Sequence, residues 1–289
     1  MKIKHIERDV AFLGITGART PFAISQSNQS HVMAILREGL YSDRYMAVLR
    51  EYASNAWDAH VSAGILETPI KITLPTPESL ILSIRDYGHG MSETDMMEVF
   101  TQYGDSTKRD NNDSVGMLGI GSKSGFAYTD AFTIISYHKG LKSTYSAVLD
   151  QTNIGSLTKL IDEPCQESGL EVLIPVLKQD LKEFQNRAMA LFRYFKPKPI
   201  INIEIPKSNS MEFEHGFIDH ARDSNWVAVM GCVPYRINLD HIKDDLINLG
   251  YYQPLARMSG GLYFQIGDKE VSASREELKY TDSTKSCFD

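Results

Sequence analysis

Three polar residues stand at helical spacing in the run Glu51-Tyr-Ala-Ser-Asn55-Ala-Trp-Asp58-Ala. Offsets of four and three residues place Glu51, Asn55 and Asp58 on one face of a helix. A carboxylate on that face could orient or deprotonate a water molecule, and an amide oxygen is a ligand that Mg²⁺ accepts. The same trio would also suit a helix face that meets only solvent. Its chemistry therefore depends on what the rest of the chain brings near it.

A second group, Asp86-x-Gly88-x-Gly90-Met91, directly follows the strand-like run 79–85. A carboxylate at a strand end can accept a hydrogen bond from an exocyclic amine. Adenine carries an amine at that position and guanine a carbonyl, so this aspartate would select ATP over GTP. Glycines at 88 and 90 would let the backbone lie close to a purine. Taken alone, the pattern is also that of an ordinary turn.

The third group is the glycine-rich segment 116–123 (Gly-Met-Leu-Gly-Ile-Gly-Ser-Lys), which precedes an apolar run. Successive backbone amides leading into a helix can cradle an anion, and the lysine adds a positive charge. Ser122 stands where a Walker A loop needs lysine, and the spacing from Gly121 to Gly125 does not fit the dinucleotide-binding GxGxxG pattern. The segment therefore predicts a phosphate cradle of another kind.

The elements that must position these groups follow from local signals. Asp43 is a suitable N-cap and Gly64 a suitable stop, so we expect one helix over 43–63 to carry the polar trio. Ser92 with Asp95 indicates a capping box. Further helices are expected at 30–38, 180–195 and 239–249, and strands at 68–74, 79–85, 133–137, 143–148, 169–175, 200–205, 226–230 and 261–266. Short connections between the strands favour a mixed, largely antiparallel sheet.

The rigid run Lys196-Pro-Lys-Pro199 cannot continue a helix and marks the expected domain boundary. We expect a first domain over 1–198, opened by an extended strap over 1–30, and a second domain over 199–289.

Composition limits the class of protein. The 289 residues are 42% hydrophobic and carry a formal net charge of −7, which argues against a general nucleic-acid-binding surface. Cys165, Cys232 and Cys287 form no CxxC pair, and the histidines form no HExxH spacing, so a metal held only by protein side chains is not indicated. The chain shows no signal peptide and no apolar run of about 18 residues, the length that a membrane span would need. A reducing cytoplasm is the expected compartment.

In this order, the polar helix box, the DxGxG group and the glycine-rich segment resemble the GHKL superfamily, which contains DNA gyrase B, Hsp90, histidine kinases and MutL. The resemblance implies an α+β fold: a two-layer α/β sandwich of the Bergerat ATP-binding type, followed by a smaller α/β transducer-like domain. Histidine kinases carry two asparagines in the helix box and a preceding histidine-bearing helix. This sequence has neither feature, so hydrolysis is favoured over phosphotransfer.

The resemblance also implies ATP and Mg²⁺ as ligands, with Asn55 holding the metal and Glu51 acting on the attacking water. Lys108, in the polar segment 103–114 expected to form a lid, could reach a phosphate or remain in solvent. The run Ser-Ala-Ser-Arg275-Glu-Glu277-Leu looks like the Hsp90 middle-domain segment whose arginine reaches the γ-phosphate, and it also reads as a helix start with Ser274 as N-cap. Nucleotide contacts are expected from Asn55, Asp58, Asp86, Gly88, Gly90, Met91, Gly116, Gly119, Ile120, Gly121, Ser122 and Lys123. The pair Gly169-Leu170 departs from the Gly-Thr pair that many members carry, so base recognition would depend more on Asp86 and water.

Within the superfamily, the helix box, the run 121–140 and the SREEL motif are most similar to bacteriophage rIIA-type proteins. That similarity implies an ATP-hydrolysing switch that acts on lysis timing, exclusion or defence in the host cytoplasm, reaching a membrane only through partners. Expected partners are a second copy on nucleotide binding and an unidentified host protein. Such proteins are often longer, so the chain would be a shorter relative or an N-terminal fragment. Two alternatives stay open: a non-hydrolysing ATP-binding protein that captures a host target, and part of a DNA-handling ATPase like MutL or a type II topoisomerase.

Overall fold

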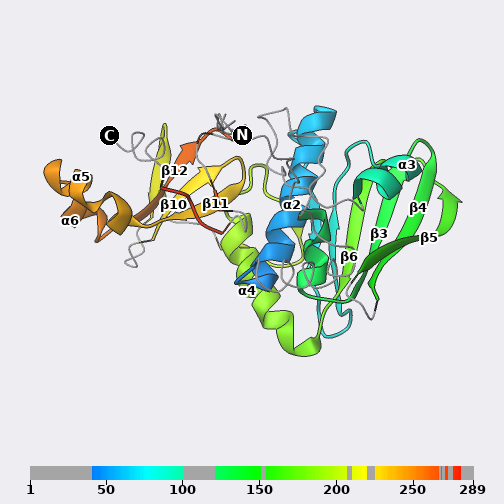
Figure 1. Ribbon diagram of the computed structural model, residues 1–289. Helices are drawn as coiled ribbons and strands as arrows, with labels where there is room; N and C mark the ends of the chain where they lie inside the picture. The colour runs from blue at the N-terminus through cyan, green and yellow to red at the C-terminus, as the bar shows by residue number, and fades with distance from the viewer. Residues whose placement is uncertain are drawn as a thin grey trace, which may run out of the picture.

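A computed structural model describes residues 41–100, 121–150, 154–206, 210–219, 225–266, 268, 271–272 and 276–280 (Figure 1). The strap expected at 1–30 and the helix expected at 30–38 lie outside these residues. None of the described helices is both long and apolar enough to cross a membrane.

In the described part of the chain, the larger sheet has seven strands and is mostly antiparallel. Only β1 and β7 pair in parallel among them. In order across the sheet, the strands are β5 (Gly155–Pro164), β4 (Leu141–Leu149), β3 (Ala131–His138), β6 (Gly169–Pro175), β2 (Ile81–Arg85), β1 (Lys71–Thr73) and β7 (Ile200–Ile201). This mixed sheet confirms the expected sheet type.

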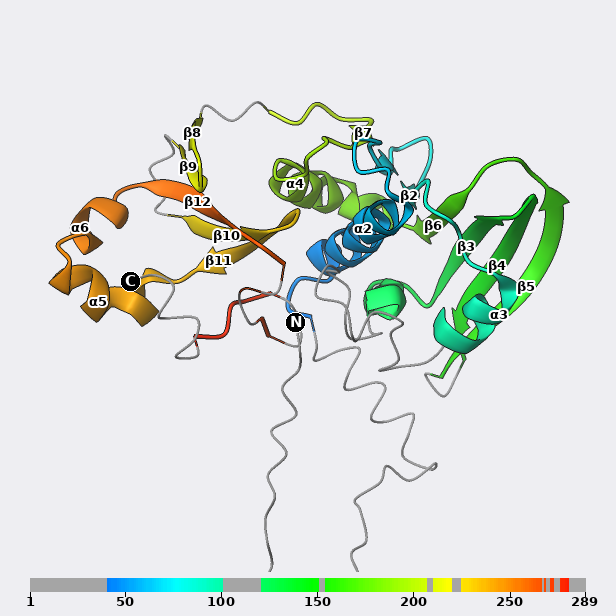
Figure 2. The same cartoon turned by 90° about the horizontal axis from the view of Figure 1, so that it is seen from above.

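Two helices cover one face of this sheet, α2 (Arg44–Ala63) and α4 (Leu181–Phe192) (Figures 1 and 2). Alternate residues of the central strands, such as Leu82 in β2 and Ile134 in β3, are fully buried and belong to the same core as Leu49 of α2. The apolar side chains on one face of the strands thus pack against the apolar stripe of α2 to form the core.

Helix α2 begins and ends where local signals predict. The Asp43 carboxylate accepts a hydrogen bond from the Met46 amide at 3.0 Å, and Gly64 adopts a left-handed conformation with φ 69°. Arg187 of α4 donates to the other Asp43 oxygen at 2.6 Å, so the N-cap is also held by the neighbouring helix. The N-terminal end of α2 is therefore fixed both locally and by tertiary contact.

Shorter helical segments follow the sheet strands. The capping box of Ser92 and Asp95 is present and opens α3 (Glu93–Asp95), which continues into η2 (Met96–Phe100). The glycine-rich segment enters a 3₁₀ helix, η3 (Gly121–Ala127), and η4 (Lys178–Asp180) precedes α4.

A second sheet of five strands is formed by the later described residues. Its order is β11 (Val233–Ile237), β10 (Trp226–Met230), β12 (Ser259–Phe264), β9 (Gly216–Asp219) and β8 (Ser210–Phe213). The helical segments η5 (Leu239–Ile242), α5 (Lys243–Asn248) and α6 (Tyr252–Leu255) connect β11 to β12.

Helices α2 and α4 lie between the two sheets (Figures 1 and 2). Arg193, at the end of α4, pairs with Asp219 of β9 at 2.5 Å. The carboxylate of Glu276 accepts hydrogen bonds from the Ser42 amide and hydroxyl, both at 2.9 Å, and from the Asp43 amide at 3.2 Å. The C-terminal segment therefore touches the first residues of α2.

Several expectations about elements need correction. Strands β5, β8, β9 and β11 were not predicted. The strand expected at 200–205 is limited to β7 and joins the first sheet through β1. The helix expected to start at Ser274 does not continue through the described residues that follow, because Glu277 and Leu278 form isolated β-bridges with Arg236 and Val271. The division into domains at residue 198 remains a prediction.

Candidate functional site

Helix α2 holds the polar trio in unequal environments. Glu51 and Asp58 are buried, with exposed fractions of 1% and 2%, whereas Asn55 between them is partly exposed. A carboxylate as buried as Glu51 needs hydrogen-bonding partners. Arg50 supplies one, because its Nε lies 3.3 Å from Oε1 of Glu51 and the guanidinium is itself buried. The trio is thus not an ordinary solvated face.

The glycine-rich segment meets α2 at Glu51. A Cβ atom built on Gly121 would lie 2.6 Å from Oε2 of Glu51, a distance that real Cβ atoms do not reach. Tyr52 ties the same two elements together, since its hydroxyl donates to the Ser122 carbonyl at 2.9 Å and accepts from the Gly125 amide at 3.1 Å. Burial raises the pKa of the Tyr52 phenol, so this hydroxyl keeps its proton. The start of η3 is therefore fixed against the carboxylate.

The DxGxG group meets the same helix two turns further on. A Cβ on Gly88 would lie 3.0 Å from both Cβ and the carbonyl oxygen of Ala59. Glu51, Asn55 and Ala59 are spaced by four residues, so they form one stripe about 12 Å long. Gly121 lies at one end of this stripe and Gly88 at the other, with the partly exposed Asn55 between them.

Asp86 is buried and is held by its own turn. One carboxylate oxygen accepts the Gly88 amide at 2.8 Å, and the Asp86 amide donates to the Leu170 carbonyl at 2.9 Å. Leu170, which stands in the pair that departs from the expected Gly-Thr, thus contributes its backbone carbonyl. The aspartate is positioned at the end of β2 by the adjacent strand β6.

Gly90 and Met91 are explained by packing against the sheet. Gly90 has φ 67°, and a Cβ there would overlap the Tyr137 carbonyl oxygen of β3. The Met91 amide donates to the buried Ser136 hydroxyl at 2.8 Å, which in turn donates to the Met91 carbonyl at 2.7 Å. Contact of either residue with a purine remains a prediction.

Lys123 does not extend into solvent. It is buried in η3, and its ammonium lies 5.8 Å from the centroid of the Phe100 ring. Ser122, the residue before it, is partly exposed and accepts from Tyr52 through its carbonyl. A cation is therefore present at the glycine-rich segment, next to the end of η2.

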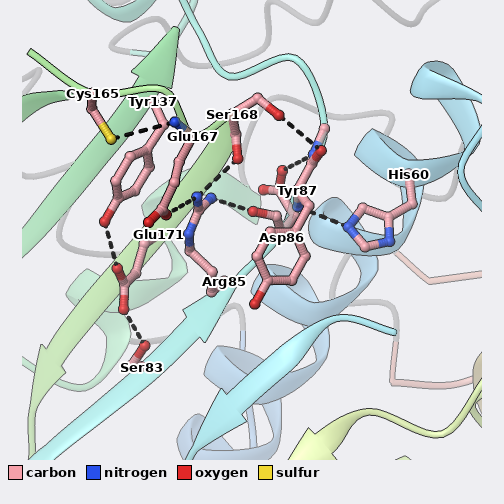
Figure 3. A network of polar contacts seen from close by, with 11 residues as sticks. His60, Ser83, Arg85, Asp86, Tyr87, Tyr137, Cys165, Glu167, Ser168 and Glu171 are labelled. Carbon is pink, nitrogen blue, oxygen red and sulfur yellow. Dashed lines mark hydrogen bonds and ion pairs between the residues drawn. The ribbon is translucent and has the colours of Figure 1, made fainter. Parts of the chain in front are cut away.

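A polar network fixes the turn that carries Asp86 (Figure 3). The Arg85 guanidinium donates to the carbonyls of Asp86 and Ser168 and pairs with Glu167 at 3.2 Å. It also lies 3.8 Å from the centroid of the Tyr137 ring. Burial raises the pKa of the Tyr137 phenol to about 12. The arginine thus links the end of β2 to the loop before β6.

His60 of α2 completes this network from the helix side (Figure 3). Its Nε2 lies 2.8 Å from the Tyr87 amide, and its Nδ1 lies 2.9 Å from the Thr68 carbonyl. The turn after β2 is thereby bonded to the same helix that carries Glu51 and Asn55.

Several predicted site residues lie outside the described residues: Lys108, Gly116, Gly119, Ile120 and Arg275. Among the described residues, no group of three or more His, Cys, Asp or Glu side chains is arranged to hold a metal ion.

Sequence reasoning missed three residues that the structure places at the site, Arg50, Tyr52 and His60. Arg50 and His60 directly flank the polar box, but no spacing rule distinguishes them from surface residues. Tyr52 has the pattern of a core residue, and its hydroxyl contacts depend on a segment 70 residues later. Only tertiary packing reveals these roles.

One comparison with known proteins finds a similar family. A family model described as histidine kinase-, DNA gyrase B-, and HSP90-like ATPase matches residues 43–179, from the N-cap of α2 into η4. A comparison with curated proteins finds no match. The mixed fold, with one large sheet and several helices, fits a GHKL ATPase domain. The match supports a GHKL-type ATPase domain over residues 43–179, and a domain of this type suggests ATP binding, typically with Mg²⁺.

Proposed function

We propose that the chain is a Mg²⁺-dependent switch that binds and hydrolyses ATP. The observation that carries this proposal is the stripe of α2 from Glu51 through Asn55 to Ala59, with Gly121 against one end and Gly88 against the other. Two glycine motifs more than 30 residues apart in sequence thus approach one helix about 12 Å apart. That separation suits an extended nucleotide, with its base near Gly88 and its last phosphate near Gly121.

The residues present fit such a ligand. Glycine suits both approaches, since a Cβ at either position would crowd α2, at the Glu51 carboxylate for residue 121 and at Ala59 for residue 88. At the base end, Asp86 would accept a hydrogen bond from the adenine amine, an interaction worth about 1.5–3 kcal/mol when the acceptor is charged. At the phosphate end, the amides of the glycine-rich segment and Lys123 would stabilise negative charge.

Asn55 would hold the metal, because its amide oxygen is of the ligand type that Mg²⁺ prefers and its side chain is partly exposed. Bound Mg²⁺ would neutralise charge on the phosphate oxygens. Asp58, buried one turn further along α2, would order water in the pocket.

Glu51 would orient or deprotonate the water that attacks the terminal phosphate. Arg50 fixes its carboxylate from the protein side, and Gly121 lets the phosphate-binding segment lie against it. Such positioning is the main contribution of a protein to phosphoryl transfer.

The segment around Arg275 would complete the site on nucleotide binding. Support comes from Glu276, the next residue, which accepts hydrogen bonds from Ser42 and Asp43 at the start of α2. In this proposal Arg275 stabilises the transition state, and Lys108 reaches a phosphate when residues 103–114 close over the nucleotide. Both roles rest on the sequence resemblance.

A second candidate is an ATP-binding protein that does not hydrolyse. It is favoured by one observation: the Glu51 carboxylate is 1% exposed and already bonded to Arg50. Water would have to reach this carboxylate before hydrolysis could occur.

For the biological setting we propose a bacteriophage rIIA-type role in the host cytoplasm, which rests on the sequence similarity alone. The switch would dimerise on ATP binding and capture a host protein. Affinity capture from host lysate with Glu51→Ala as an ATP-bound trap, against the same variant without nucleotide, would identify that partner.

The biochemical proposal is tested by ATP affinity and phosphate release of the purified protein, with Mg²⁺ and with EDTA. We expect Mg²⁺-dependent release that Asn55→Ala abolishes. Binding without any release would favour the second candidate. Absence of ATP binding would reject both.

A further inference from the structure

His60 is a buried histidine whose two ring nitrogens both bond to backbone, at Thr68 and at Tyr87. Figure 3 shows the contact with Tyr87. It lies on α2 directly after the polar box and is 2% exposed. Tyr87 can only donate through its amide, so Nε2 must accept and cannot carry a proton. The proton is then on Nδ1, which donates to the Thr68 carbonyl. The contacts of the ring therefore define one neutral tautomer.

The Tyr87 amide belongs to the turn that presents Asp86. From the sheet side, Arg85 bonds the Asp86 carbonyl, and the Ser168 hydroxyl donates to the Tyr87 carbonyl at 3.3 Å. From the helix side, His60 bonds the Tyr87 amide, its ring centroid lies 6.1 Å from that of Tyr87, and Gly88 approaches Ala59. His60 thus bonds the Asp86 turn directly to α2.

We infer that neutral His60 is a positioning residue for the base-binding turn. It holds the Asp86 carboxylate at a fixed place relative to Asn55, the proposed metal ligand, and Glu51, which is proposed to act on water. The inference rests on the proposed function, because in it His60 aligns the part of the site that binds the base with the part that binds the phosphates. It predicts that His60 controls the preference for adenine over guanine, and not merely the stability of the fold.

Protonation of His60 would break this arrangement, because Nε2 would then present N–H to the Tyr87 N–H. Burial lowers the pKa of His60, the Arg85 charge lowers it further, and the bond to Thr68 opposes both. The ionisable groups on the elements around the ring are Asp58 on α2, the exposed Glu67 before Thr68, and Arg85, Asp86 and Tyr87 at the end of β2. ATP affinity should therefore fall in acid.

Two substitutions separate the ring contacts. The amide of glutamine reaches about as far as Nε2, so His60→Gln can still accept from Tyr87. The amide of asparagine reaches only about as far as Nδ1, so His60→Asn can keep the Thr68 contact but leaves the Tyr87 amide unpaired. Affinities for ATP and GTP are measured for both variants and the natural chain at pH 8 and pH 5.5.

At pH 8 we expect His60→Gln to bind ATP nearly as the natural chain does. His60→Asn should bind about tenfold more weakly, because its Asp86 turn is no longer held in position. The ratio of GTP to ATP dissociation constants should fall in His60→Asn. At pH 5.5 the natural chain should bind ATP more weakly than His60→Gln does. Because both proteins are measured with the same nucleotide, any change in the ionisation of ATP affects both equally.

An unchanged GTP to ATP ratio in His60→Asn, or equal pH dependence in the natural chain and His60→Gln, would overturn the inference. Hydrogen exchange of the Tyr87 amide provides a test without nucleotide. Exchange should be faster in His60→Asn than in His60→Gln, and equal rates would contradict the proposed contact. If no variant binds ATP, the proposed function fails, while the exchange result still decides whether His60 holds the turn.

Discussion

Gly121 lies directly against the carboxylate of Glu51, where a Cβ atom would stand 2.6 Å from Oε2. The glycine-rich segment and helix α2 therefore meet at one atom. Because a Cβ at residue 121 would force the Glu51 carboxylate to move, the contact ties the geometry of the glycine-rich segment to that of α2.

Gly121→Ala should lower the rate of phosphate release strongly while lowering the free energy of unfolding only modestly. The added methyl must displace the Glu51 carboxylate, and a misplacement of about 1 Å can cost about 100-fold in rate. The overpacking itself should cost about 1–3 kcal/mol in the free energy of unfolding. Phosphate release and urea unfolding measure the two effects.

Gly64→Ala is the matched control. Gly64 ends the same helix with φ 69°, so alanine is strained there by about 1–2 kcal/mol, but a Cβ meets no described atom within 4 Å. The rate of phosphate release per folded molecule of Gly64→Ala should equal that of the natural chain. Equal rates for the two alanine variants would argue against the role of the Gly121 contact.

Tyr52→Phe should destabilise the protein and loosen the glycine-rich segment. The substitution removes the hydroxyl that joins the Ser122 carbonyl to the Gly125 amide, leaving buried backbone groups unpaired. The expected loss is about 1–3 kcal/mol in the free energy of unfolding, measured by urea titration. Tyr145→Phe is the control, since among the described residues its buried hydroxyl has no partner in good hydrogen-bond geometry and is only influenced by the nearby Ser143. That variant should be as stable as the natural chain or more stable, and a similar loss in both would contradict the assignment.

The stability of the natural chain should fall as pH decreases below about 6.5, the ordinary pKa of histidine. Burial lowers the pKa of His60 in the folded state, so the unfolded chain takes up a proton first and is favoured as pH drops. Above pH 6.5 both states are neutral at this residue and the effect vanishes. Urea unfolding from pH 8 to pH 5 should show a steeper decline for the natural chain than for His60→Gln. Parallel curves would rule out His60 as the source.

Glu276→Ala should weaken the contact between the C-terminal segment and α2. It removes three hydrogen bonds from Ser42 and Asp43 and a negative charge near the N-terminus of a helix. The contact is largely exposed, so the expected loss is about 1 kcal/mol. Glu276→Gln keeps an acceptor for the two amides and should retain most of the stability. If alanine and glutamine behave alike, charge rather than hydrogen bonding holds this contact.

Helix α2 could be predicted to its ends because Asp43 and Gly64 are local signals that tertiary packing did not override. The central strands were likewise visible from their alternation. Strand β5 was missed because it lies at the edge of the sheet and most of its residues are exposed, so its sequence lacks a buried face. Isolated β-bridges take the place of the expected helix. Glu277 pairs with Arg236, which is distant in sequence, and Leu278 pairs with the nearby Val271. Local sequence signals do not reveal either partner.

The candidate site was only partly predictable. The spacing of Glu51, Asn55 and Asp58 indicated a shared helix face, but it did not indicate that Glu51 is buried against Arg50 and Gly121. No sequence pattern states that a glycine will approach a particular side chain. The chemical roles of these residues remain predictions.

The most direct test of the central claim is phosphate release by Glu51→Gln. Glutamine has the same shape and can still accept from Arg50, so ATP affinity should remain within a fewfold of that of the natural chain. Loss of a general base should lower the rate by roughly 100-fold or more. Glu163→Gln, an exposed change on β5, should leave the rate unchanged. If the natural chain binds ATP but releases phosphate no faster than Glu51→Gln, the chain is not the hydrolytic switch proposed.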